Sequence, residues 1–200
     1  SALAQSLSHP TERAQAPLHI TVLCSQPSSA RGDDREDQVP RYEHWENVEI
    51  YRGGWSIDAK RSLSHRALSY GSFLMWLMWR LIFKTTSDDH ILVVTNPPFA
   101  PMITWVCAKL KRLFGSKLKY SVILHDLYPD GLIALGKLSA HSWWIKLWRR
   151  VNRYTLQSSE AVITLGRDMS AYCRDVYQLS DHHCKVITNW SPVNFDEIPL

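Results

Sequence analysis

The chain lacks the short glycine-containing motifs that most often identify a nucleotide-binding or hydrolytic protein. Its 200 residues contain no GxGxxG, no GxxxxGK[ST] and no GxSxG. These motifs respectively bend the backbone around a dinucleotide pyrophosphate, cradle phosphates and expose a nucleophilic serine. Glycine is also scarce, with 8 residues and none before Gly32. We therefore expect neither a dinucleotide cofactor, nor a phosphate-binding loop, nor a serine hydrolase site.

Cysteine is sparse and scattered. The four cysteines are Cys24, Cys107, Cys173 and Cys184. A chain of this length does not need disulfides to fold, so free thiols in a reducing compartment are the simplest interpretation. A zinc site could be drawn from Cys173 and His182-His183-Cys184, but three consecutive residues rarely reach one tetrahedral ion. We expect no metal site.

Charge is unevenly distributed, although the formal net charge is only +4. Residues 1–60 carry −3, residues 61–155 carry +10 and residues 156–200 carry −3. Six of the nine tryptophans lie in the basic middle section: Trp76, Trp79, Trp105, Trp143, Trp144 and Trp148. Basic residues interleaved with tryptophan favour an anionic interface, either bilayer headgroups or a nucleic acid. The alternative is that the tryptophans pack in the core and the cations lie on a solvated surface.

Short apolar, β-branched runs alternate with longer segments of helical periodicity. The predicted strands are residues 19–24, 48–51, 91–95, 118–124, 161–165 and 185–188. The predicted helices are residues 58–84, 98–114, 142–157 and 167–177. The polar stretch 25–47 is predicted to be a loop. This alternation predicts an α/β fold with a Rossmann-like, doubly wound and mainly parallel sheet, in which ligands bind beyond the carboxyl ends of the strands.

Two of the predicted helices suggest a membrane surface. Residues 67–83 carry a single charge, Arg80. We do not expect this segment to span a bilayer, because strands that need the rest of the sheet lie on both sides of it; a buried or membrane-facing helix remains.

The helix at 142–157 combines aromatic and basic residues. One face gathers Trp144, Leu147, Trp148, Val151 and Thr155, and the opposite arc holds Lys146, Arg149, Arg150 and Arg153. This pattern predicts a membrane-surface stripe made by Trp144, Lys146, Trp148, Arg149, Arg150 and Arg153, which would meet anionic headgroups. An ordinary surface helix with a solvated basic face is the alternative.

A histidine and an aspartate directly follow one of the predicted buried strands. His125 and Asp126 begin the segment His125-Asp126-Leu127-Tyr128-Pro129-Asp130-Gly131. A histidine at this edge can exchange a proton with a bound hydroxyl, or donate a hydrogen bond to it, near neutral pH. The structural alternative is that His125 only caps the next turn through backbone contacts.

The order of these motifs resembles the N-terminal domain of retaining family-four glycosyltransferases. The matching segments are Ser25-Gln26-Pro27, Tyr51-Arg52-Gly53, Asn96-Pro97-Pro98, His125 to Asp130, Gly166-Arg167 and Asn189-Trp190. Within that group the chain is most similar to bacterial enzymes that build extracellular or O-antigen polysaccharide on a lipid carrier, including fucosaminyltransferase-like members. The resemblance covers nearly the whole chain and rests on the order and spacing of short motifs.

The resemblance implies one half of a GT-B fold. Residues 1–189 would be the acceptor-binding domain and residues 190–200 the start of the interdomain linker. His125 would be catalytic, close to the sugar being transferred. The residues implied to contact the acceptor are Asn96, Pro97, Pro98, His125, Asp126, Tyr128, Asp130, Gly166 and Arg167. The nucleotide-sugar donor would bind mainly the second domain, so we expect no cofactor on this chain.

The chain departs from the family at both ends. Residues 1–7 look like the tail of a first helix, so the first strand and its glycine-rich loop are expected to be missing, and the donor domain is expected to be missing as well. We expect the chain alone to be inactive, with a donor domain completing the enzyme in cis or in trans.

A lipid-linked sugar acceptor and an anionic membrane surface are the expected partners, at the cytoplasmic side of the membrane. A noncatalytic lipid- or partner-binding module is the alternative, and a nucleic-acid-binding domain, not expected here, is the third hypothesis.

Overall fold

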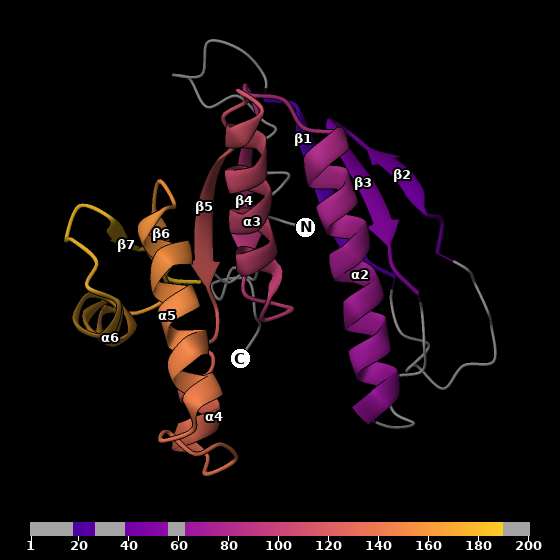
Figure 1. Cartoon of the computed structure of the whole chain (residues 1–200). Coiled ribbons are helices and arrows are strands. Elements are labelled where there is room, and N and C mark those ends of the chain that lie inside the picture. Colours follow the sequence, from indigo (N-terminus) through magenta and orange to yellow (C-terminus); the bar gives the residue numbers. More distant parts are fainter. Residues whose placement is uncertain (1–17, 27–38, 56–62, 190–200) are drawn as a thin grey trace, which may run out of the picture. The chain divides into compact units, whose positions relative to one another are not determined.

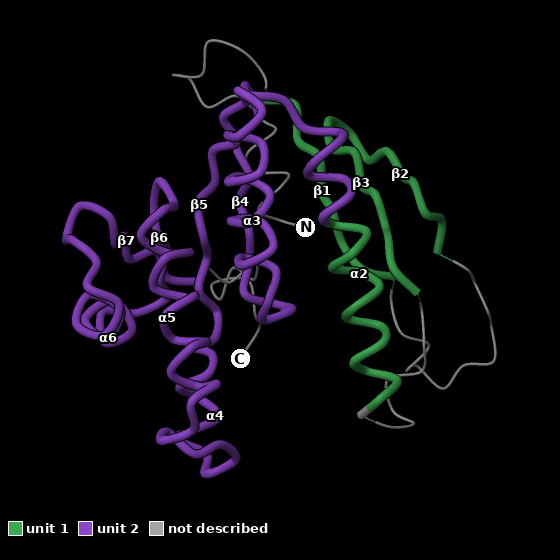
Figure 2. Tube along the Cα trace, viewed as in Figure 1, with its two compact units in different colours: residues 1–77, 191–200 green, residues 78–190 purple. Residues whose placement is uncertain are grey.

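The computed structural model describes residues 18–26, 39–55 and 63–189 (Figure 1). The chain divides into two compact units, which Figure 2 colours separately. Unit 1 contains residues 1–77 and 191–200, and unit 2 contains residues 78–190. The expected helix remnant at 1–7 and linker at 190–200 lie outside the described residues.

Unit 1 contains a three-stranded sheet and most of a long helix. The strands are β1 (Ile20–Ser25), β2 (Tyr42–Trp45) and β3 (Val48–Gly53), in the order β1-β3-β2. β1 pairs with β3 in parallel, and β2 pairs with β3 in the antiparallel direction. Helix α2 (Leu63–Phe83) begins in this unit. A side chain at Gly53 would come within 1.9 Å of the Trp76 indole, so glycine lets the helix approach the strand closely.

Unit 2 contains a four-stranded parallel sheet in the order β4-β5-β6-β7. Its strands are β4 (His90–Val94), β5 (Lys119–Leu124), β6 (Val162–Thr164) and β7 (Cys184–Val186). Its helices are α3 (Ala100–Leu113), α4 (Asp130–Ala134), α5 (Trp143–Gln157) and α6 (Arg167–Tyr177). The strands follow chain order, so right-handed crossovers through α3, α5 and α6 place these helices on one face of the sheet. The sheet order therefore collects the loops after all four strands at one carboxyl edge.

The core of unit 2 lies between this sheet and its helices. Val122 and Val162 sit side by side on adjacent strands and are fully buried, as is Ile145 of α5. The buried Tyr120 donates a hydrogen bond of 2.6 Å to the carbonyl oxygen of Thr155, which fixes α5 against β5. Burial raises the pKa of Cys107 to about 11 and that of Cys173 to about 12, so both thiols stay protonated at neutral pH.

The predicted α/β fold with a mainly parallel sheet is confirmed, and the strands and helices differ from prediction in three places. Residues 42–45, predicted as loop, form strand β2, because the turn at Glu46-Asn47 pairs them with β3. Glu46 adopts the left-handed conformation there, with φ 54°. The short helix α4 was not predicted. The strands also pair as two sheets instead of one.

None of the helices in the described ranges combines the length and the apolar character that a bilayer-spanning segment needs. This result includes α2. Its 21 residues contain the segment 67–83, which was predicted not to span a bilayer.

Candidate functional site

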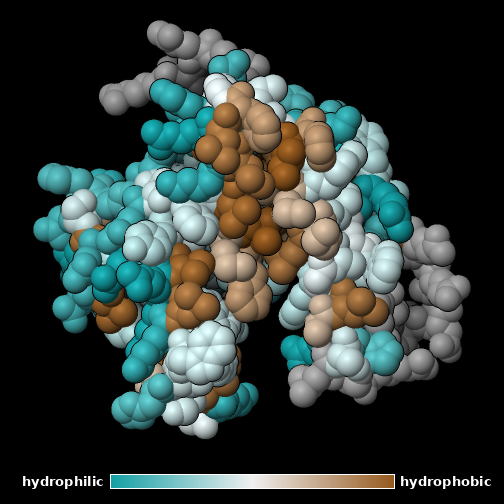
Figure 3. Space-filling model, in the orientation of Figure 1, coloured by the Kyte–Doolittle hydropathy of each residue, from teal (hydrophilic) through white to brown (hydrophobic). Residues whose placement is uncertain are grey.

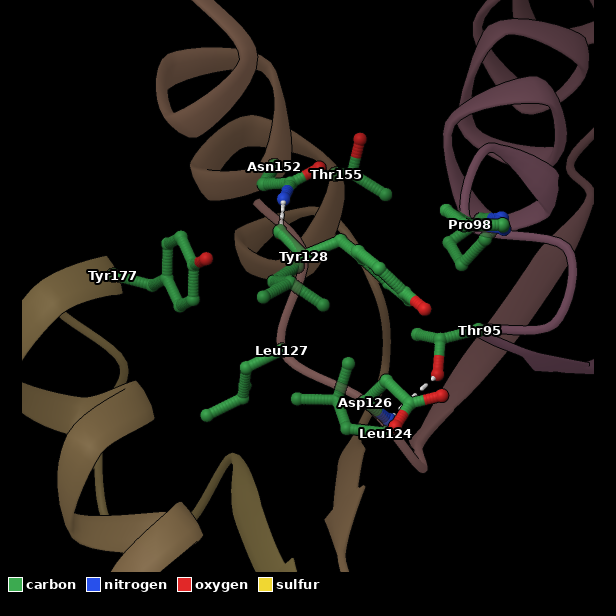
Figure 4. Close-up of a pocket in the computed structure, with 11 residues that line it drawn as sticks. Thr95, Pro98, Leu124, Asp126, Leu127, Tyr128, Asn152, Thr155 and Tyr177 are labelled. Carbon is green, nitrogen blue, oxygen red and sulfur yellow. Dashed lines mark hydrogen bonds between the residues drawn. The ribbon is translucent and has the colours of Figure 1, made fainter. Parts of the chain in front are cut away.

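The loops after β4 and β5 are held together at the carboxyl edge of the unit 2 sheet. The buried Thr95, directly after β4, accepts hydrogen bonds from the backbone N–H groups of His125 (3.0 Å) and Asp126 (3.2 Å). Figure 4 shows Thr95 next to Asp126 in this position. Thr95 therefore positions the two residues predicted to carry chemistry. Sequence analysis missed this role, because a threonine at the end of a strand carries no distinctive pattern.

His125 and Asp126 are both exposed at this edge. The imidazole of His125 takes no part in a hydrogen bond with another described residue, so it is accessible to a ligand. The structural alternative, in which His125 acts only through backbone contacts, stays open, because the local contact of His125 is the backbone N–H bond to Thr95. A neutral imidazole can accept a proton from a hydroxyl or donate a hydrogen bond to it.

The other predicted acceptor residues divide between exposed and buried positions. Asn96 and Arg167 are exposed, whereas Pro97 is buried and Pro98, Tyr128 and Gly166 are partly buried. Arg167 begins α6, after β6, and thus lies at the same edge as the loops after β4 and β5.

A small pocket behind this edge collects three of the predicted residues (Figure 4). Pro98, Asp126 and Tyr128 line it together with Thr95 and Asn152, among others. Asn152 of α5 donates a hydrogen bond of 2.5 Å to the carbonyl oxygen of Tyr128. The space that a water-sized sphere can occupy is about 20 Å³. Because one water needs roughly 10–15 Å³ by the same measure, the pocket holds about one water and no sugar. A sugar ring would have to bind outside it, over the exposed loops.

Asp130, predicted to contact the acceptor, is instead buried in a polar cluster. Its carboxylate forms an ion pair with Arg149 of α5, at 2.5 Å from Nη2 and 2.7 Å from Nε. Tyr177 of α6 donates a hydrogen bond of 2.9 Å to the other carboxylate oxygen. Burial and the adjacent Asp130 charge raise the pKa of Tyr177. Asp130 therefore ties α4 to α5 and α6, which leaves little of its carboxylate for a ligand.

The residues of α5 that are buried in the structure differ from those of the apolar face predicted from the sequence. The buried residues are Ile145, Thr155 and Leu156, whereas Leu147 and Trp144 are 51% and 38% exposed. Arg149, predicted on the outer basic stripe, turns towards Asp130 because that buried carboxylate needs a partner. Trp143 is 75% exposed and lies on the outer surface of α5, although the predicted membrane-surface stripe did not include it.

A cationic groove lies between α5 and α6. Four cations and two other residues line it: Lys146, Arg149, Arg150, Arg153, Tyr154 and Val176. Its volume is about 410 Å³, within the ordinary range of ligand sites. All four predicted membrane-surface cations thus surround one hollow.

Exposed aromatic rings form a row beside the loop after β4. Phe99 stacks on Trp148 with ring centres 4.8 Å apart, and Trp148 stacks on Trp144 at 6.2 Å. Phe99 and Trp144 are each more than a third exposed. Stacked rings that remain exposed can contact an apolar chain or a sugar ring.

The C-terminal half of helix α3 departs from the usual pattern of a surface helix. Its buried residues include Thr104 and Lys111, and the Lys111 ammonium donates hydrogen bonds to the carbonyl oxygens of Ile82 (3.0 Å) and Thr85 (2.7 Å). Leu110 is 37% exposed and Leu113 is 80% exposed. Phe114, just beyond the helix, is 86% exposed. The space-filling view shows apolar residues gathered over α3 (Figure 3). The helix thus turns one of its three cations inward and exposes apolar residues at its C-terminal end.

These features define unit 2 as a Rossmann-like α/β half-domain with its polar loops at the carboxyl edge of a parallel sheet. No family model matches the chain. The chain is similar to the Pseudomonas aeruginosa protein named "Probable glycosyltransferase WbjE", with 28% identity over 136 residues. The match covers 66% of this chain and 32% of that protein, so it spans about a third of the relative's length. This similarity supports a relationship to glycosyltransferases in general.

The described residues contain no group of three histidine, cysteine or acidic side chains placed to hold a metal ion.

Proposed function

We propose that this chain is the acceptor-binding part of a glycosyltransferase that moves a sugar from a nucleotide donor to a lipid-linked acceptor. The observation that carries the proposal is the similarity to a glycosyltransferase over two thirds of the chain. The finer assignment is the N-terminal domain of a retaining, family-four, GT-B enzyme of the fucosaminyltransferase-like kind, acting in cell-surface polysaccharide synthesis. It is supported by the order of the motifs from Asn96-Pro97-Pro98 to Asn189-Trp190.

In this proposal the acceptor binds over the carboxyl edge of the unit 2 sheet. His125, held in place by Thr95, faces the acceptor hydroxyl or the transferred sugar and exchanges a hydrogen bond or proton with it. Asn96, Asp126 and Arg167 supply further polar groups at the edge, and Tyr128 lies beside the adjoining pocket. The donor binds mainly a second domain beyond this chain, supplied in cis or in trans, and the chain alone does not turn over.

The lipid part of the proposal rests on the outer faces of α3 and α5. These two helices contain seven basic residues and no acidic one, and five of the seven remain on the outer faces once the inward Lys111 and Arg149 are set aside. Leu110 and Leu113 of α3 and Trp143 and Leu147 of α5 are exposed beside these cations. Exposed apolar and aromatic residues next to basic ones are typical of helices that lie in the headgroup region of an anionic bilayer. We therefore propose that the protein associates peripherally with the cytoplasmic face of a membrane.

The role of His125 is tested in the intact polypeptide that carries this sequence. Labelled nucleotide sugars are incubated with that protein and membrane lipids, and label in the lipid extract is measured. His125→Ala is expected to lower transfer by roughly a hundredfold or more, the usual loss when a positioned acid or base is removed. His141→Ala, at another exposed histidine of unit 2, is the matched control and should leave transfer unchanged. Equal transfer by both variants would refute the catalytic assignment.

A noncatalytic membrane-binding module is the second candidate, and the outward apolar face of α3 favours it. Vesicle flotation distinguishes the two functions when it is combined with the transfer assay. A polypeptide that floats with vesicles of phosphatidylcholine and phosphatidylglycerol but transfers no sugar from any nucleotide donor would support the module. Leu110→Ser/Leu113→Ser should abolish flotation, whereas Leu135→Ser, at an exposed leucine outside α3, should not.

A further inference from the structure

The residues that line the groove between α5 and α6 favour the binding of an anion. Four of the six residues that line it are cations, and no acidic residue is among them. Lys146 and Arg153 each lie three and four positions from Arg149 and Arg150 on α5, and like charges at these spacings repel one another. The nearby Asp130 carboxylate is already bound to Arg149 and Tyr177. Arg149 is thus neutralised by Asp130, whereas Lys146, Arg150 and Arg153 form no ion pair with a described residue.

Two of the four cations are fixed in place before any ligand binds. The Asp130 carboxylate holds the Arg149 guanidinium, and Arg153 donates a hydrogen bond of 3.0 Å to the carbonyl oxygen of Val176. Each arginine has five N–H donors, so these contacts leave donors for a ligand. Lys146 and Arg150 are exposed, line the same groove and supply further N–H donors. Arginines that are already positioned lose less side-chain entropy when they bind an anion.

We infer that this groove is a binding site for a phosphate or diphosphate group. Phosphate oxygens accept charge-assisted hydrogen bonds from arginine and lysine, and guanidinium groups match their geometry. The volume of about 410 Å³ accommodates such a group with part of the molecule that bears it. The inference does not depend on sugar transfer, because it rests on the cations and shape of the groove alone.

A phosphate group can reach the groove from two sources. One is a phosphate in solution, for which inorganic pyrophosphate is the probe. The other is the headgroup of a phospholipid, for which vesicles of phosphatidylcholine with phosphatidic acid are the probe. Both have the same chemistry, so the two probes are measured separately.

The test compares two double variants of the full chain. Lys146→Gln/Arg150→Gln removes the two exposed groove cations and leaves the Arg149 and Arg153 contacts intact. Lys137→Gln/Lys185→Gln removes two exposed cations of unit 2 that lie outside α3 and α5, and it matches the change in net charge. Pyrophosphate affinity is measured by titration calorimetry at low salt, vesicle affinity is measured by flotation, and circular dichroism confirms folding.

The inference predicts saturable binding of at least one probe, weakened roughly tenfold or more by the groove variant and little changed by the control variant. Loss of pyrophosphate binding assigns the site to a soluble phosphate compound, and a loss confined to vesicles assigns it to a lipid headgroup. Absence of binding to both probes would overturn the inference. So would equal weakening by the two variants, because binding would then follow net charge alone.

Discussion

Two ion pairs of unit 2 have similar chemistry and very different surroundings. Arg149 and Asp130 join α5 to α4, and their side chains are 36% and 8% exposed. Arg174 and Asp181 join α6 to the following loop, and theirs are 40% and 76% exposed. The first pair neutralises a buried carboxylate, whereas the second lies in solvent, where water screens it. The comparison teaches that an ion pair of this unit is expected to maintain the fold where it neutralises a buried carboxylate, and to contribute little where both partners lie in solvent.

The largest expected effect is at the buried pair. Asp130→Ala leaves the Arg149 guanidinium and the Tyr177 hydroxyl without their acceptor. We expect a loss of about 3 kcal/mol in the free energy of unfolding, a figure already reduced for the partial exposure of Arg149. Urea unfolding of the chain measures it. Asp130→Asn keeps one acceptor oxygen and should cost less; an Asp130→Ala protein as stable as the wild type would show that the cluster does not maintain the fold.

An intermediate effect is expected at the inward lysine of α3. Lys111→Met keeps the apolar stem but removes the donor to the carbonyl oxygens of Ile82 and Thr85. We expect a loss of about 1.5–2 kcal/mol, at the lower end of the range for hydrogen bonds that involve a charged group, because the methionine keeps the apolar stem. Lys109→Met, at an exposed position on the same helix, is the control and should change stability by less than about 0.5 kcal/mol. Equal effects at both positions would mean that Lys111 is not buried in solution.

The smallest effect is expected at the exposed pair. The hydrogen bond from Arg174, together with its charge, holds the pKa of Asp181 below its ordinary value. The pair therefore stabilises the fold above the ordinary aspartate pKa, and this contribution is lost as pH falls through the lowered pKa. Because Asp181 is exposed, Asp181→Asn should leave the urea midpoint at neutral pH within error and barely change its acid dependence. A clear destabilisation at neutral pH that disappears in acid would show that this pair also maintains the fold.

The buried strands and long helices could be predicted because each carries a strong periodic pattern. β4 and β5 are short runs of largely apolar residues between turn signals, and α6 has the predicted bounds. β2 was missed because its four residues, Tyr42–Trp45, lie in a charged stretch and become a strand only through pairing with β3.

The candidate site was predictable in position but not in orientation. His125 and Asp126 follow β5, and the parallel sheet brings them to the same edge as the loop after β4. The inward turns of Lys111 and Arg149 could not be predicted, because helical periodicity assigns charged residues to the outer face. Their partners are backbone carbonyls at the end of α2 and a carboxylate in α4, which only the tertiary fold brings near.

The proposed function is tested most directly by measuring how much sugar the intact polypeptide transfers to an acceptor lipid. The lipid is presented either in anionic vesicles or in detergent. The account predicts that His125→Ala loses transfer in both settings, because the histidine acts at the carboxyl edge. It predicts that Leu110→Ser/Leu113→Ser loses transfer in vesicles but keeps it in detergent, because the α3 face acts only at the membrane. Undiminished transfer by His125→Ala in both settings would contradict the central claim that sugar transfer occurs at this edge.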